Sequence, residues 1–224
     1  MKDTPRLRPF GIVASEQATS IAVARFDLTP FISAGIPFPV MHRSAHSLRV
    51  IADTTGLSVS PLLDDSGEDA VRVHGYFNNR RELKIDAVWV KASSAKYRTA
   101  LAQRNLTGGL IDQRLPSGLH ADHIVNRASL RALLAAGHAP WLMLFEVPAA
   151  ANSGFGALVE RHLPPFDETT PQIHLGPEHI FKLYATDWPR NRNEFEKALK
   201  DIADQVHNPR IVADIRTRFA PLFR

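Results

Sequence analysis

The sequence predicts an α+β fold in a single domain, and three observations support this expectation. The chain has 224 residues, of which 44% are hydrophobic, enough to build one substantial core. Apolar and polar residues alternate over 71–90, as in a β-hairpin. Near the C-terminus, apolar residues recur at helical spacing, at Phe195, Leu199, Ile202 and Val206.

The N-terminal part, residues 1–92, is expected to be rich in strands. Short apolar runs over 1–60 are broken by Pro and Gly, which suits strands and loops better than long helices. The hairpin over 71–90 follows. Its expected turn is the segment FNNRRE, residues 77–82, because Asn tolerates positive φ angles.

The middle part, residues 93–165, is expected to combine strands and helices. The expected elements are a helix over 93–106, a strand, turn and strand over 110–127, a helix over 128–137, a buried strand over 141–148 and a helix over 152–164. Ser93 or Ser94 is the expected cap of the first helix, and Asn152 that of the last.

The C-terminal part, residues 166–224, is expected to pack on the same domain. A loop that contains Pro covers 163–178, and a helix with an expected cap at Asn193 follows it. A second helix is expected over 211–219.

Composition narrows the functional classes. The absence of Cys excludes disulfides, thiolate metal sites and a Cys nucleophile, so a metal would have to bind His, Asp, Glu or Asn. The net charge of +4 is a mild surplus that permits nucleic-acid binding without requiring it. We find no apolar run of the roughly 18 residues that a membrane span needs and no secretory signal, and therefore expect a cytoplasmic protein without a membrane partner.

The segment GLHADHIVNRASL, residues 118–130, carries the principal functional motif, the adjacent pair Asp122 and His123. A carboxylate binds hard cations, and an imidazole of ordinary pKa, near 6.5, can accept a proton at neutral pH. Phosphodiester hydrolysis needs both a water that loses a proton and a cation on the phosphate oxygens. A second interpretation is that His120 and His123 share a metal, although their spacing favours a helix over a strand.

The order strand, strand, helix around this pair resembles the HNH endonuclease superfamily, in particular the HNH domain of the RNA-guided CRISPR effectors. The matching motifs are DHIV at 122–125, the apolar strand LMLFEV at 142–147, the link PAAA and NSG at 152–154. The resemblance covers residues 118–162. It implies an embedded ββα-metal unit with His123 as the catalytic general base. Asp122 and Asn152 would bind Mg²⁺ or Mn²⁺, with Zn²⁺ less suited and His162 as an alternative ligand.

One geometric condition accompanies this interpretation. Successive side chains of a regular strand face opposite ways, so Asp122 and His123 can serve one site only if the strand bulges or ends at 122–123. A structural explanation also stands beside each residue, since Asn152 is a favourable N-cap and a DH pair can occur by chance.

Four arginines are candidate nucleic-acid contacts, because a guanidinium group suits phosphate: Arg127, Arg161, Arg80 and Arg81. The sequence thus predicts a magnesium-dependent HNH-like endonuclease of DNA, with RNA less favoured. The alternative is a non-catalytic binding or interaction protein with a degenerate or coincidental ββα unit. A weaker third option is a metal-dependent hydrolase of small phosphoesters.

Overall fold

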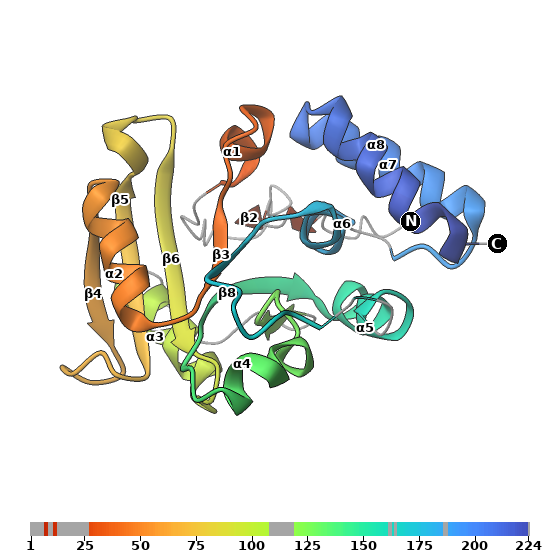
Figure 1. Ribbon diagram of the computed structural model, residues 1–224. Helices are drawn as coiled ribbons and strands as arrows, with labels where there is room; N and C mark the ends of the chain where they lie inside the picture. Colours follow the sequence, from red (N-terminus) through yellow and green to blue (C-terminus); the bar gives the residue numbers. More distant parts are fainter. Residues whose placement is uncertain are drawn as a thin grey trace.

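The computed structural model describes residues 27–107, 119–160, 163, 165–185 and 188–223, together with two short strands near the N-terminus. These strands, β1 (Leu7–Arg8) and β2 (Gly11–Ile12), pair with each other. At the centre of the fold is an antiparallel sheet of seven strands, in the order β4-β5-β6-β8-β3-β9, with β7 paired to β8 (Figure 1). The α+β class is confirmed.

The strands of this sheet come from all three parts of the chain. Their bounds are β3 (Pro39–His42), β4 (Leu57–Leu62), β5 (Ala70–Tyr76), β6 (Lys84–Lys91), β7 (Leu119–Asp122), β8 (Trp141–Pro148) and β9 (Gln172–His174). Strand β8 is the centre of the arrangement. Its first half pairs with both β6 and β3, whereas its second half pairs with β7.

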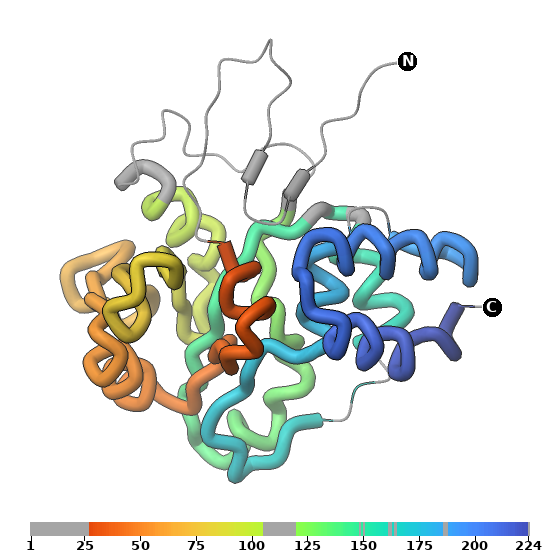
Figure 2. The backbone as a smooth tube through the Cα atoms, turned by 90° about the horizontal axis from the view of Figure 1, so that it is seen from above, coloured from red at the N-terminus to blue at the C-terminus, as the bar shows by residue number. Residues whose placement is uncertain are grey.

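Helices cover both faces of the sheet. Their bounds are α1 (Thr29–Ser33), α2 (Ala45–Thr54), α3 (Tyr97–Thr107), α4 (Arg131–Ala135), α5 (Ala149–Leu158), α6 (Pro177–Tyr184), α7 (Arg192–Val206) and α8 (Pro209–Phe219). Helix α2 packs with Val71 and Val73 in the main core, while α3 packs with Val88 and Val90 in a second core on the opposite face. Helices α5 to α8 gather at one end of the sheet (Figure 2).

The elements with a strong local pattern agree with the sequence expectations. Strands β5 and β6 form the expected hairpin, and Asn78 and Asn79 in its turn have φ angles of 54° and 59°. Strand β8 covers the expected 141–148. Helix α7 buries the expected apolar side of its surface, but its cap is Asn191 rather than Asn193: the Asn191 side chain accepts a hydrogen bond from the Glu194 amide at 3.0 Å.

Several expected bounds were wrong. Helix α2 replaces expected strand or loop, since Ser44 caps it and Ser47 completes a capping box. The expected helix over 128–137 is a 3₁₀ turn, η2 (Arg127–Leu130), followed by the short α4. Strand β9 lies within the expected loop 163–178. The first expected strand after 110 lies outside the described residues.

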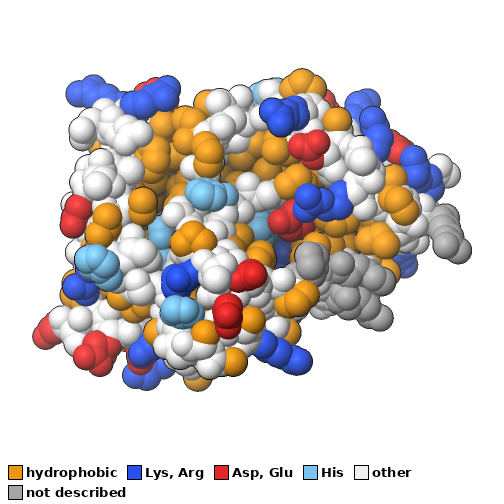
Figure 3. Space-filling view, in the orientation of Figure 1, with side chains coloured by type: hydrophobic (Ala, Val, Ile, Leu, Met, Phe, Trp, Pro, Cys, Tyr) orange, Lys and Arg blue, Asp and Glu red, His pale blue; other side chains and the backbone are white. Residues whose placement is uncertain are grey.

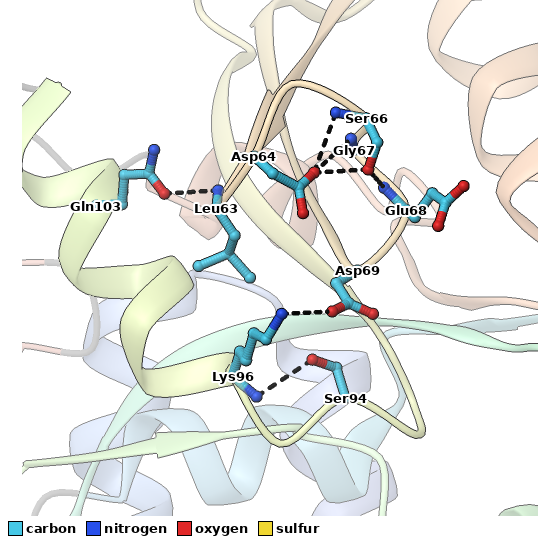
Figure 4. Close-up of polar contacts among 9 residues, drawn as sticks. All are labelled: Leu63, Asp64, Ser66, Gly67, Glu68, Asp69, Ser94, Lys96 and Gln103. Carbon is cyan, nitrogen blue, oxygen red and sulfur yellow. Dashed lines mark hydrogen bonds and ion pairs between the residues drawn. The ribbon is translucent and has the colours of Figure 1, made fainter.

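The turn between β4 and β5 is held by its own side chains and by α3 (Figure 4). Asp64 Oδ1 accepts hydrogen bonds from the hydroxyl of Ser66 at 2.6 Å and from the amides of Ser66 at 3.0 Å and Gly67 at 3.2 Å. These bonds, that of the hydroxyl above all, hold the pKa of the carboxyl below its ordinary value. Lys96 forms an ion pair with Asp69 at 3.1 Å, and the side chain of Gln103 in α3 accepts a hydrogen bond from the Leu63 amide. These contacts fix the outer edge of the sheet on the α3 face.

Among the described residues, no helix combines the length and the apolar character that crossing a bilayer requires.

Helix α5 packs so closely on Trp188 that one of its glycines has no room for a side chain. A Cβ atom on Gly154 would lie 2.1 Å from Trp188 Cδ1, and Trp188 in turn contacts Phe155 and Phe181. We expect Gly154→Ala to lower the free energy of unfolding by about 1–3 kcal/mol through overpacking, although Ala is favoured over Gly by about 1 kcal/mol in an open helix. Urea unfolding checks this, with Gly156→Ala as control, since its nearest contact would be 3.7 Å away. Equal stability of the two variants would contradict the packing.

Candidate functional site

The ββα unit expected from the sequence is present as β7, β8 and α5. Asp122 at the end of β7 pairs with Phe145 of β8, and α5 begins at Ala149, directly after β8, and contacts both strands. Strand β7 ends at Asp122, as the geometric condition on the Asp-His pair required. A 3₁₀ turn and α4 occupy the stretch between the two strands.

Asp122 and His123 nevertheless point to different neighbours. Asp122 faces helix α6, where its carboxylate meets Lys182. His123 faces the segment before and at the start of α3: its ring centroid is 4.7 Å from that of Tyr97. The end of the strand therefore does not bring the two side chains to a common point.

The carboxylate of Asp122 belongs to a buried ion-pair cluster. Lys182 Nζ lies 2.7 Å from Asp122 Oδ2 and 3.3 Å from Glu160 Oε1. The Lys182 side chain is only 1% exposed, against 16% for Asp122 and 19% for Glu160. Asn126 Nδ2 donates to the other oxygen of Glu160 at 2.9 Å. Both carboxylates are thus held by one ammonium group.

His120 takes the place in the site that His123 was expected to occupy. It lies two residues before Asp122, on the same face of β7, and Asn152 of α5 reaches it. Asn152 Nδ2 lies 3.3 Å from His120 Nδ1, so that the amide donates and the ring nitrogen accepts. The proton of the neutral imidazole then resides on Nε2.

His123 is poorly placed to act as a general base. The Arg127 guanidinium donates to its Nε2 at 2.9 Å and also to the Ser94 carbonyl oxygen at 2.8 Å. Burial, and then the charges of Arg127 and Lys182, lower the pKa of His123 to about 3. General bases work best with a pKa near the working pH. The assignment of His123 as the catalytic base is therefore not supported by its surroundings.

Asn152 was expected to cap its helix, and this expectation was wrong. Helix α5 starts three residues earlier, at Ala149, so Asn152 lies inside the first turns. The three alanines of 149–151 have a high helix propensity, which outweighs the preference of Asn152 for the position just before a helix. From this position its side chain can reach β7.

The residues present do not fit the metal ion that the HNH resemblance implies. The Asp122 carboxylate is ion-paired with Lys182, and the Asn152 amide is turned to His120. Within the ranges that the structure describes, no group of three His, Asp or Glu side chains could hold a metal ion. Asp122 and Asn152, as they lie among the described residues, are therefore not arranged to bind Mg²⁺, Mn²⁺ or Zn²⁺.

The expected phosphate contacts are dispersed. Arg127 is engaged inside the fold with His123 and Ser94. Arg80 and Arg81 are exposed in the turn of the β5–β6 hairpin, where Arg80 pairs with Glu82 at 2.7 Å. Lys and Arg side chains gather over this hairpin and over the C-terminal helices on one face of the molecule (Figure 3). Arg161 and His162 lie outside the described residues.

The sequence interpretation missed both Lys182 and Glu160. Lys182 stands between Ile180-Phe181 and Leu183-Tyr184, all of them buried. A single cation inside an apolar run is a signal that a buried carboxylate partner exists, because an unpaired ammonium group in a core is very costly. That signal could have identified Lys182, although not its partners.

Comparison of the chain with protein-family models, with curated proteins and with solved structures finds no match in any of the three.

Proposed function

We propose that this protein is a hydrolase of phosphodiester bonds in nucleic acid, with DNA favoured over RNA, and that His120 is its catalytic residue. The observation that carries the proposal is that Asn152 of α5 reaches His120, which shares one face of β7 with Asp122. The order of β7, β8 and α5 is the one that led to the HNH resemblance.

The chemistry assigned to His120 follows from its hydrogen bond. With Nδ1 accepting from Asn152, Nε2 carries the proton and can donate it to a phosphate oxygen or to the leaving alkoxide. Rotation of the Asn152 amide by half a turn would place its oxygen toward Nδ1 and leave Nε2 free to accept a proton. Asn152 is thus a positioning residue.

The test is a nicking assay on plasmid DNA, with single-stranded DNA and RNA in parallel and with either Mg²⁺, Mn²⁺ or EDTA. We expect His120→Ala to reduce cleavage at least about a hundredfold, the usual contribution of a general acid or base, and His123→Ala to retain most activity. His46→Ala is the matched control, because His46 is an exposed histidine on α2. If His120→Ala cleaved DNA as the wild type does and His123→Ala did not, the assignment of His120 as the catalytic residue would be refuted.

The second candidate is a non-catalytic nucleic-acid-binding protein. It is favoured by the internal engagement of both members of the Asp-His pair, Asp122 with Lys182 and His123 with Arg127. This candidate would be favoured if the protein retarded DNA in a gel but cleaved none of the substrates with Mg²⁺, with Mn²⁺ or with EDTA. We then expect charge reversal of Arg80 and Arg81 to weaken binding and its dependence on salt.

A further inference from the structure

Asp122 and Glu160 are arranged like the ligands of a cation site, and the ammonium group of Lys182 lies where a cation would bind. The two carboxylates come from different elements, the end of β7 and the residue pair after α5, and both approach the Lys182 ammonium group. Asn126 holds the second oxygen of Glu160, so this carboxylate is oriented independently of Lys182. Within the described residues, the fully buried oxygen Asp122 Oδ2 has no partner besides Lys182.

Lys182 has no room to withdraw from the two carboxylates. Its side chain is 1% exposed, and its ammonium group lies 5.0 Å from the ring centroid of Phe155. On α6 its sequence neighbours Phe181 and Leu183 are buried as well. Leaving the cluster would place an unpaired ammonium group among apolar side chains, which is more costly than remaining.

The other titratable groups around the ammonium do not compensate the carboxylates. His179, on the same helix, is buried and accepts a hydrogen bond from the Gly176 amide through Nδ1, so that it is neutral. His123 receives its hydrogen bond from Arg127. Glu178 is paired with Arg218 at 2.6 Å. Lys182 is therefore the cation that balances Asp122 and Glu160.

A divalent ion would need the oxygens that Lys182 already holds. Mg²⁺ and Ca²⁺ bind carboxylate oxygens at about 2.0–2.6 Å, and an ion at that distance from Asp122 Oδ2 would meet the like charge of Nζ, which is 2.7 Å from the same oxygen. The ammonium and the divalent ion are thus mutually exclusive at this carboxylate pair.

We infer that Lys182 is the resident cation of this site and that it excludes divalent metal ions from Asp122 and Glu160. Removal of its charge converts the pair into a divalent-cation site. A cavity of about 110 Å³ borders Glu160, together with Ser129 and His179, and gives space for water molecules beside this carboxylate. The inference concerns which cation the carboxylates bind and holds whether or not the protein hydrolyses nucleic acid.

The experiment is a titration with Mn²⁺ in which the electron paramagnetic resonance signal of free Mn²⁺ reports binding. Lys182→Met is expected to gain one Mn²⁺ site at least tenfold tighter than any site of the wild type. Lys182→Met/Asp122→Asn is expected to lose that site. The matched control is Lys200→Met, which removes an exposed Lys of α7 and should bind as the wild type does.

Tight binding of one Mn²⁺ by the wild type, with no gain in Lys182→Met, would overturn the inference. If Lys182→Met does not fold, Lys182→Gln replaces it. A second measurement needs only the wild type, whose imidazole proton signals are recorded with Mn²⁺. One equivalent of Mn²⁺ should leave the imidazole proton signals of His120 sharp, whereas selective broadening of these signals would place the metal beside Asp122 and refute the exclusion. A wild type that cleaves no nucleic acid, together with Mn²⁺ titrations that give the expected results, would refute the proposed hydrolase but not the inference about Lys182.

Discussion

Replacement of Lys182 by Met is expected to lower the free energy of unfolding by about 3–5 kcal/mol, the usual effect of removing one partner from a buried ion pair. The cause is the carboxylates that remain. Asp122 Oδ2 is fully buried and loses its partner, and among the described residues Glu160 keeps only its hydrogen bond from Asn126. Urea unfolding at pH 7 measures the change. Lys200→Met, on the exposed side of α7, should change stability by less than about 0.5 kcal/mol.

The same experiment separates the charge of Lys182 from its volume. Adding Asp122→Asn to Lys182→Met removes one of the uncompensated charges and should restore part of the lost stability, so the two substitutions are expected to be strongly non-additive. A Lys182→Met variant as stable as Lys200→Met would show that the ion-pair cluster does not form.

The stability of the protein is expected to fall steeply as the pH is lowered from about 6.5 to about 4. Burial lowers the pKa of His42 to about 4 and that of His179 to about 4, whereas both titrate near 6.5 in the unfolded chain. Between these values the unfolded state binds more protons, so stability rises with pH there and is complete above 6.5. Each histidine contributes a slope of up to about 1.4 kcal/mol per pH unit.

Equilibrium unfolding in urea at a series of pH values tests this expectation. His42→Leu is expected to reduce the slope and, at pH 7, to be at least as stable as the wild type, because both ring nitrogens of His42 are buried without a hydrogen bond from the described residues. His46→Ala, at an exposed position of the adjoining helix α2, should leave the slope unchanged. A profile that is flat from pH 7 to 4 in the wild type would mean that neither buried histidine is kept neutral by the fold.

The sequence predicted those helices and strands whose own residues show a clear pattern of apolar positions. The alternation of 71–90 predicted the β5–β6 hairpin, the apolar run 141–148 predicted β8, and the helical spacing from Phe195 to Val206 predicted α7. The predicted start of α5, at Asn152, was wrong. Asn is a favourable N-cap, but the three alanines before it favour the helix more strongly, so the helix begins at Ala149.

The site was predicted less completely, because its decisive contacts join distant parts of the chain. The segment 119–123 was correctly expected to carry polar side chains at a strand end. The choice of His123 as the catalytic base followed the HNH resemblance and required its side chain to share a site with Asp122. The contacts of His123 with Tyr97 and Arg127, which lead it elsewhere, have no signal in the sequence. Neither the pairing of Asp122 with Lys182 nor the reach of Asn152 to His120 leaves a local signature.

The central position of β8 has a consequence for how the protein folds. Met41 of β3 pairs with Leu142 of β8, and Ile173 of β9 completes the same row, so the middle of the sheet joins segments that are remote in sequence. Loops between such segments close slowly, and proteins dominated by non-local pairing fold slowly. Because β7 and α5 depend on the second half of β8, the His120 site should be completed in the slowest refolding phase, after the local β5–β6 hairpin has formed.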